Sequence, residues 1–234
     1  MGRADGFRCY TTKSNKSNKP LIKPFSEKRI ETLNNSTIAN LAASDLETME
    51  IDGVQVPILI TYVNKFERKS FLINHILLKE DKDLALRLMW REYFDYVISF
   101  DHSRNNVNTI FFHNLGSFDG YFVYKALLDY IDPDNINAII DDSNKFITIT
   151  LNINNQVFIF KDSLRIFPMS LTGLCKTFGV EGKSSKYIKA FNSLNLFDNK
   201  DLLEMFIDYG MQDSIALYNA LVNAQSKIFH SILN

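Results

Sequence analysis

The 234-residue sequence contains only two cysteines, Cys9 and Cys175, which lie far apart and have no histidine at a metal-ligand spacing. A disulfide framework or a zinc site would show more cysteines in a closer pattern, so neither is expected. The sequence also lacks a long hydrophobic run, because its longest apolar stretch, 56–63, contains Pro57 and Thr61. We therefore expect no membrane-spanning helix and no membrane partner.

The sequence also lacks an excess of positive or negative charge, since 26 Lys and Arg against 27 Asp and Glu give a formal net charge of −1. This excludes a protein that coats nucleic acid by bulk charge, but not one with a local binding groove. Residues 1–31 carry eight basic and three acidic side chains and lack the apolar region of a secretory signal. We expect residues 1–36 to form a flexible basic tail, with a transit peptide as the weaker alternative, and residues 37–234 to form one domain.

Hydrophobic periodicity predicts a mixed sheet flanked by helices. Short β-rich segments bounded by turn signals predict strands at 38–46, 56–63, 69–77, 109–112, 146–153 and 157–160. Helical spacing predicts helices at 83–97, 119–128, 170–178 and 202–228, the last one broken near Tyr209 and Gly210. Asn154 and Asn155 predict a hairpin turn. Strands first, then alternating helices and strands, indicate an α/β fold.

Two acidic residues, Asp45 and Glu47, flank Leu46 at the end of the first predicted strand. Side chains alternate across a strand, so both carboxylates project to one face. The preceding segment, 38–44, is nearly uncharged, so we expect the pair to lie at the edge of the hydrophobic core. Acidic pairs at strand ends are more often solvated turn residues, so this pair alone is weak evidence for a functional site.

Two further polar features lie at helix positions. Asn114 and Asp119 stand among aromatic residues at a predicted strand-to-helix junction. The helix dipole favours an aspartate in a first turn, but this explanation leaves Asn114 and the Phe pair 111–112 unaccounted for. On the last predicted helix, Tyr209 and Asp213 are four residues apart and therefore share one face. Taken singly, this pair is more often a half-exposed tyrosine beside a solvated aspartate.

Together the acidic residues predict a metal site. Four carboxylates, those of Asp45, Glu47, Asp119 and Asp213, come from a strand, a helix start and a terminal helix, the order that a metal nuclease of the ribonuclease H-like fold needs. If they converged within about 4–6 Å, each pair would repel by roughly several kcal/mol at an effective dielectric of ~20. Two divalent cations about 3.5–4 Å apart would relieve this repulsion and clamp the reacting oxygens of a phosphodiester. Oxygen-only ligands suit Mg²⁺ or Mn²⁺.

The segments 45–48, 114–119 and 209–213 resemble, in order, the three exonuclease motifs of family B DNA polymerases. With His113 before it, the second motif is similar to that of the protein-primed subgroup of linear mitochondrial plasmids and phages. Residues 162–168 resemble the single-strand-binding segment of that subgroup. The resemblance covers residues 37–228 and implies an α/β fold of the ribonuclease H-like 3′→5′ exonuclease type, a mixed sheet flanked by helices.

Carried over by position, the resemblance implies a role for each matching residue. The ligands of the two cations would be Asp45, Glu47, Asp119 and Asp213, and Tyr209 would orient the attacking water. The residues that hold the frayed 3′ end of single-stranded DNA would be Thr48, Asn114, Phe118, Ser163 and Leu164. The family also uses a lysine after the single-strand-binding segment, for which Lys183 is the candidate and Lys186 a rival, because the spacing fits imperfectly.

The resemblance implies a proofreading role in DNA replication, a mitochondrial location and a terminal priming protein as a further partner. Nothing after Asp213 resembles the polymerase motifs, so we expect the polymerase domain to be absent and this chain alone not to synthesise DNA. Two alternatives stay open. One is a non-catalytic remnant that binds DNA or the terminal protein. The other is an RNA-processing exonuclease of the same fold, for which the ribose 2′-OH would be the distinguishing contact.

Overall fold

A computed structural model describes residues 41–99, 108–182 and 186–233, with side chains described except at Ser99 and 229–233. The predicted basic tail, residues 1–36, and the predicted catalytic Lys183 lie outside the described residues. None of the helices in these described ranges is long and apolar enough to cross a membrane.

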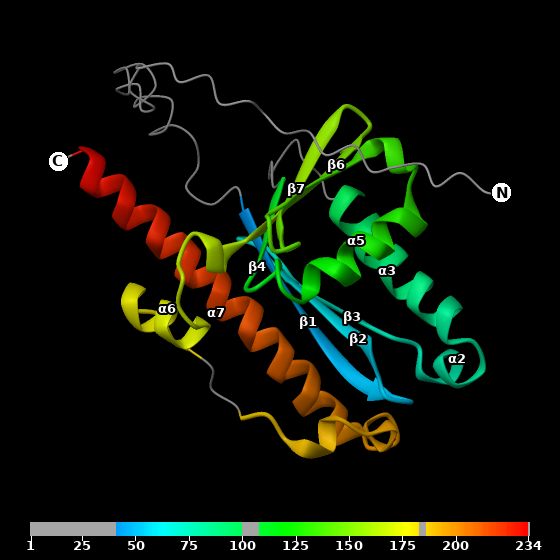
Figure 1. Cartoon of the computed structure of the whole chain (residues 1–234). Coiled ribbons are helices and arrows are strands. Elements are labelled where there is room, and N and C mark those ends of the chain that lie inside the picture. The colour runs from blue at the N-terminus through cyan, green and yellow to red at the C-terminus, as the bar shows by residue number, and fades with distance from the viewer. Residues whose placement is uncertain (1–40, 100–107, 183–185, 234) are drawn as a thin grey trace. The chain divides into compact units, whose positions relative to one another are not determined.

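Seven strands form one mixed sheet in the order β3-β2-β1-β4-β7-β6-β5 (Figure 1). The strands are β1 (Leu41–Ile51), β2 (Val54–Val63), β3 (Arg68–Leu72), β4 (Thr109–Phe112), β5 (Ile136–Ile140), β6 (Phe146–Ile153) and β7 (Gln156–Asp162). β1, β2 and β3 form an antiparallel meander, and β5, β6 and β7 form another. In the centre, β4 runs parallel to both β1 and β7. The predicted α/β fold with a mixed sheet is therefore confirmed.

Helices cover both faces of this sheet. The helices are α2 (His75–Glu80), α3 (Lys82–Ser99), α5 (Asp119–Tyr130), α6 (Leu171–Phe178) and α7 (Lys200–Leu233). Short 3₁₀ turns lie at η1 (Pro133–Asn135), η2 (Ser163–Arg165), η3 (Lys189–Phe191) and η4 (Leu194–Leu196). α6 and α7 lie together on one side of the sheet, and α3 and α5 lie on the other (Figure 1). The sheet is therefore the middle of three layers.

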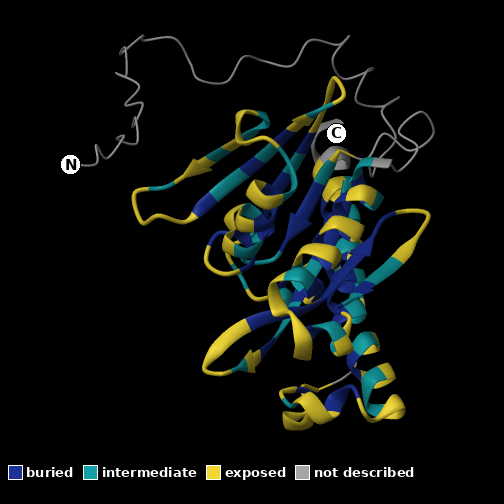
Figure 2. Ribbon diagram, turned by 90° about the vertical axis from the view of Figure 1, so that its right-hand side faces the viewer, coloured by how far each residue is buried: buried dark blue, intermediate teal, exposed yellow. Residues whose placement is uncertain are grey.

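Alternation along β1 divides its side chains between the two helical layers. Ala43 joins the cluster formed with α6 and α7, whereas Ala42 and Leu46 join the larger cluster that includes α3. Figure 2 shows buried residues concentrated along the central strands and the inner sides of the helices. The part of β1 from Ala42 to Glu47 is therefore buried or half-buried between the two helical layers.

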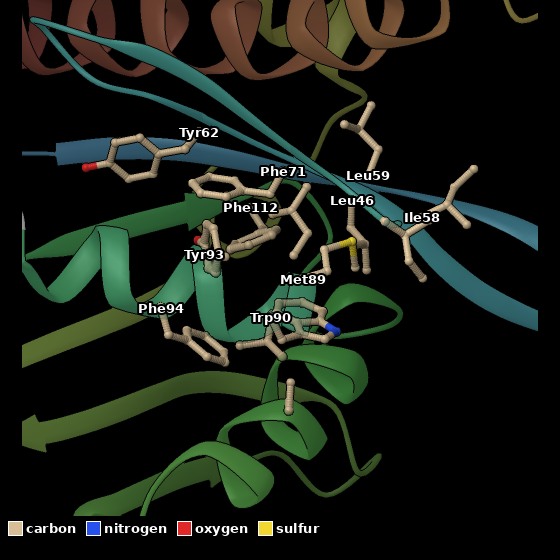
Figure 3. Packing of buried hydrophobic residues seen from close by; sticks show 14 of the residues in the cluster. Leu46, Ile58, Leu59, Tyr62, Phe71, Met89, Trp90, Tyr93, Phe94 and Phe112 are labelled. Carbon is tan, nitrogen blue, oxygen red and sulfur yellow. The ribbon is translucent and has the colours of Figure 1, made fainter. Parts of the chain in front are cut away.

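Aromatic side chains of α3 fill the larger core cluster. Trp90 stacks on Phe94 with ring centroids 5.5 Å apart, and Tyr93 meets Phe71 edge-on at 5.4 Å (Figure 3). The Tyr93 hydroxyl lies 2.9 Å from the buried Ser44 Oγ of β1. Burial raises the pKa of Tyr93 far above its ordinary value, so this hydroxyl stays protonated.

Several predicted boundaries are confirmed together with their local causes. Asn154 and Asn155 have φ of 51° and 61°, as the two-residue turn of the β6–β7 hairpin requires. Ser170 caps α6 by accepting a hydrogen bond from the amide of Gly173 at 3.2 Å. Gly179 ends this helix in the left-handed conformation, with φ of 68°.

Other predicted boundaries are wrong. The first strand continues through the predicted site to Ile51, and the third strand ends at Leu72 instead of residue 77. Asn74 explains the early end, because its side chain accepts hydrogen bonds from two amides of the first turn of α2. The predicted break near Gly210 does not occur, since α7 is one continuous helix.

The Ser44–Tyr93 pair makes a prediction about stability. In Tyr93→Phe, the buried Ser44 hydroxyl loses its partner, and we expect the free energy of unfolding to fall by about 1–3 kcal/mol. Tyr121→Phe is a matched control, because the Tyr121 hydroxyl bonds the Asn144 carbonyl at an exposed position. Urea titrations of both variants would measure the losses. Equal losses would contradict a special contribution from the buried pair.

Candidate functional site

Asp45 and Glu47 lie in the middle of β1, and not at its end as predicted. Asp45 pairs with Thr61 of β2, Glu47 pairs with Leu59, and the register shifts between Glu47 and Thr48. β1 pairs with β4 only over 41–43, so its edge beyond Ala43 on that side has no strand partner among the described residues. This edge leaves room for side chains from other elements to approach the two carboxylates.

Helix α7 approaches β1 and β2 closely at Gly210. A methyl group at this glycine would lie 3.0 Å from Leu59 Cδ2 and 3.1 Å from Glu47 Cγ, closer than side chains normally pack. One turn further, the Ser214 hydroxyl lies 2.7 Å from the buried Thr61 hydroxyl, which is also 3.3 Å from the Gly210 carbonyl oxygen. Gly210 thus serves as a contact point between helix and sheet.

This contact brings Asp213 to the strand carboxylates. Asp45, Glu47 and Asp213 each offer a carboxylate oxygen within 4.8 Å of the others. Asp213 is only 7% exposed, and the other two are half-buried. These three residues were predicted as metal ligands, and the structure places them in one cluster.

The fourth predicted acid, Asp119, is the first residue of α5 and is 5% exposed. Its burial raises its pKa well above the ordinary value, and the nearby negative charges of Asp45, Glu47 and Asp162 raise it further. Asp119 is therefore electrostatically coupled to the cluster. A bound cation would favour the charged form and release the proton.

The loop between β4 and α5 is held by Asp162, the first residue of the segment 162–168, for which the sequence predicted no individual role. Asp162 Oδ1 accepts hydrogen bonds from the amides of Asn114 (3.0 Å) and Leu164 (2.9 Å), and Oδ2 accepts one from the amide of Gly116 (2.9 Å). Gly116 allows this approach, because a methyl group there would lie 2.6 Å from the Phe146 carbonyl oxygen. Asp162 thereby fixes the segment that leads into Asp119.

Ser163 and His113 add a second link between these segments. The Ser163 hydroxyl donates to the Phe112 carbonyl oxygen at 3.0 Å. Because a hydroxyl has one proton, the His113 Nδ1, at 2.9 Å, is then the donor to Ser163 Oγ. Ser163 is fully buried, so in this structure its hydroxyl joins protein segments to one another.

The other residues predicted to bind DNA are close in sequence to the acids or to Asp162. Thr48 is half-buried on β1, and its hydroxyl donates to Gln55 Oε1 at 2.8 Å. Phe118 is 39% exposed directly before Asp119, while Asn114 and Leu164 are half-buried. Lys183 lies outside the described residues, and its rival Lys186 is exposed.

Tyr209 packs against an aromatic group that sequence analysis also missed. The rings of Tyr187 and Phe191 have their centroids 6.0 Å and 5.8 Å from that of Tyr209. Phe191 is buried on η3 and also contacts Phe206 of α7 at 5.2 Å. Next to it, the Asn192 side chain accepts a hydrogen bond from the Glu50 amide of β1 at 2.8 Å. Tyr209 is therefore held between α7 and a segment attached to β1.

The arrangement fits hard divalent cations. All donors in the cluster are carboxylate oxygens, the ligand type that Mg²⁺ and Mn²⁺ take. Carboxylates this close repel one another, and positive charge between them would offset the repulsion. The chemistry that such a site supports is hydrolysis at phosphorus or carbonyl centres.

Comparison with known proteins identifies the relatives of this chain. Residues 101–201 match the family described as DNA polymerase type B, organellar and viral. The chain is 30% identical over 171 residues to a probable DNA polymerase of Ascobolus immersus, covering 70% of this chain and 13% of that protein. It is 25% identical over 145 residues to a probable DNA polymerase of Agaricus bitorquis, covering 60% and 18%. Over these residues, the chain is similar to organellar and viral type B DNA polymerases.

Solved polymerase structures share the fold. The chain matches phi29 DNA polymerase complexed with primer-template DNA at a TM-score of 0.54 and 16% identity, over 81% of this chain and 32% of that one. For phi29 DNA polymerase complexed with single-stranded DNA, the TM-score is 0.54 with 18% identity, over 80% and 31%. These matches confirm the predicted α/β fold, a mixed sheet flanked by helices. The chain spans less than a fifth of the fungal polymerases and about a third of the phi29 polymerase.

The contact at Gly210 predicts a dependence of metal binding on helix position. Gly210→Ala would force α7 away from Glu47 and Leu59, so we expect Mn²⁺ affinity to fall by about 10-fold, as when groups that orient metal ligands are changed. In the control Gly173→Ala, the new methyl group meets no atom closer than 3.4 Å, and Mn²⁺ affinity is expected to stay unchanged. Titration of free Mn²⁺ by electron paramagnetic resonance measures both. An unchanged affinity in Gly210→Ala would contradict this role.

Proposed function

We propose that this chain is a metal-dependent 3′→5′ exonuclease that acts on single-stranded DNA ends, as the proofreading part of a DNA polymerase. The observation that carries the proposal is the convergence of Asp45, Glu47 and Asp213 from β1 and α7, with buried Asp119 coupled to them. The relationship to type B DNA polymerases supports DNA as the substrate. The phi29 structures with primer-template and single-stranded DNA add support from proteins of the same fold.

Asp45, Glu47, Asp119 and Asp213 would hold two divalent cations, Mg²⁺ or Mn²⁺. When bound, these cations supply Lewis-acid stabilisation of the charge that develops at the scissile phosphate. The cluster fits this role because its donors are oxygens only and because burial makes it costly to leave the four charges unneutralised. The helix and strand contacts at Gly210 fix the spacing of the ligands before the cations bind.

Tyr209 would orient the attacking water through its hydroxyl. Its ring is held by Phe191 and Tyr187, so the hydroxyl has a restricted set of positions relative to Asp213, one turn away on the same helix. Such positioning lowers the entropic part of the barrier. A lysine, Lys183 or Lys186, would contribute positive charge near the phosphate.

The 3′ end of the DNA would lie between β1 and the start of α5. Phe118 offers an exposed ring on which a base can stack, and Thr48 and Asn114 offer polar groups for the sugar and phosphate. Leu164 would add an apolar contact. The internal hydrogen bonds of Ser163 indicate that it would act by holding this surface in shape.

The wider setting belongs to the same proposal. We extend the proposal to a role in DNA replication, a terminal priming protein as partner, a polymerase of the linear-plasmid or phage type and a mitochondrial location. This extension rests on the resemblance of the three motifs to the protein-primed subgroup.

The direct test is cleavage of a 5′-labelled single-stranded DNA oligonucleotide by the purified chain with Mg²⁺. We expect a ladder of products shortened from the 3′ end, and loss of activity by at least about 10³-fold in Asp45→Ala/Glu47→Ala, because two cation ligands are removed. Asp201→Ala, an exposed acidic residue at the start of α7, is the control and should cleave normally.

Three outcomes would count against the proposal. Persistent full-length DNA with the wild-type chain, combined with retained DNA binding, would favour a non-catalytic binding module. Equal cleavage by the wild type and the double variant would point to a contaminating nuclease. Preference for an RNA oligonucleotide of the same sequence would favour an RNA-processing enzyme.

A further inference from the structure

A groove lies outside the carboxylate cluster, between the start of β2 and helices α3 and α5. Its volume is about 600 Å³, which is larger than a single water molecule or a small ion needs. Apolar side chains line its interior, among them Val56, Trp90 and Ala126. Figure 3 shows Trp90 on α3 among the buried residues of the larger core cluster, and Trp90 also lines the groove.

The rim of the groove is predominantly basic. Lys82, Arg87, Arg91 and Lys125 line it, against two acidic residues, Asp83 and Asp129. Arg87 and Arg91 are four residues apart on α3, so their guanidinium groups lie on one helical face. Both arginines are exposed, and neither forms an ion pair with another residue of the described ranges. The rim therefore carries positive charge that is available to an anionic ligand.

Two contacts connect the groove to the proposed DNA end-binding residues. Gln55, which lines the groove, accepts the hydrogen bond of Thr48 at 2.8 Å. Phe122, also in the lining, meets Phe118 edge-on with ring centroids 5.3 Å apart. α5 itself begins at Asp119, whose carboxyl group senses the charges of the cluster, and continues along the groove through Phe122 and Lys125. The groove is thus adjacent to the surface at which the 3′ end would lie.

We propose that this groove binds the single-stranded DNA a few nucleotides upstream of the 3′ end. The inference rests on the proposed function, because the strand is placed by its end in the carboxylate cluster. A polyanion matches the basic rim, and apolar walls suit unpaired bases. Non-specific single-strand binding combines these two features, so the groove would bind many sequences without reading bases.

The experiment compares DNA binding by the wild-type chain and Arg87→Ala/Arg91→Ala. Fluorescence anisotropy is measured in EDTA with a labelled 12-nucleotide and a labelled 3-nucleotide single strand, so that metal-dependent cleavage does not interfere. We expect the Kd of the 12-mer to rise about 10-fold and its salt dependence to fall by about 1.4 in log–log slope, for two lost phosphate contacts. The Kd of the 3-mer, which reaches only the end-binding residues, should stay unchanged.

The control variant is Lys79→Ala/Lys200→Ala, which removes two exposed positive charges that do not line the groove. It should bind both oligonucleotides like the wild type, which separates a local effect from a change in net charge. Equal 12-mer affinity of the wild type and the arginine variant would overturn the proposal. An acidic protein segment would then be the favoured ligand of the groove. Equal weakening of the 3-mer and the 12-mer would also overturn it, because the arginines would then act at the end-binding site.

A second substrate separates this inference from the proposed function. Hydrolysis of thymidine 5′-monophosphate p-nitrophenyl ester with Mg²⁺ requires the carboxylate cluster. The ester itself is too small to extend along the groove. The arginine variant is expected to hydrolyse this ester at the wild-type rate while losing affinity for the 12-mer. If the wild type hydrolyses neither ester nor DNA, the proposed function fails, and the anisotropy result still decides whether the groove binds single strands.

Discussion

The contact between helix α7 and strands β1 and β2 at Gly210 is the constraint on which the site depends. Because this residue has no side chain, the helix lies within van der Waals distance of Glu47 and Leu59, and Asp213 reaches the strand carboxylates. The buried hydroxyls of Thr61 and Ser214 hold the same interface with a hydrogen bond. Placing acidic groups together in a largely buried position opposes folding, and the packing of α7 and the core under β1 must offset that repulsion.

Helix α5, which carries Asp119, is held in place by hydrogen bonds and not by close packing at a glycine. Asp162 at the end of β7 accepts three backbone hydrogen bonds, which fix the loop between β4 and α5 and thereby the start of the helix at Asp119. Since β4 runs parallel to β1 and β7, this loop emerges beside the carboxylates of β1. The parallel centre of the sheet therefore determines where Asp119 lies, and the hydrogen bonds of Asp162 determine its orientation. Burial and neighbouring charge then raise the pKa of Asp119, which links its ionisation to occupancy of the cluster.

Local sequence signals predicted the mixed α/β fold, most helices and the β6–β7 hairpin, because each depends on periodicity or turn residues. The edge strand β5 was missed, since Ile139 and Ile140 are both exposed and the segment shows no apolar alternation. The break expected at Gly210 was wrong because a glycine inside a helix can serve close packing against a sheet, which periodicity cannot reveal. The acidic residues could be singled out from their order along the chain. The roles of Asp162, Phe191 and Asn192 could not, because each acts through a contact distant in sequence.

A crystal of this chain soaked with Mn²⁺, with anomalous diffraction recorded near the manganese absorption edge, tests directly whether Asp45, Glu47, Asp119 and Asp213 bind divalent cations. Mn²⁺ scatters anomalously, so its position is independent of any assumption about the ligands. We expect anomalous peaks about 2.1 Å from carboxylate oxygens of Asp45, Glu47 and Asp213, with Asp119 as a further ligand. Density for the four side chains without any anomalous peak between them, at Mn²⁺ concentrations that occupy other sites, would contradict it.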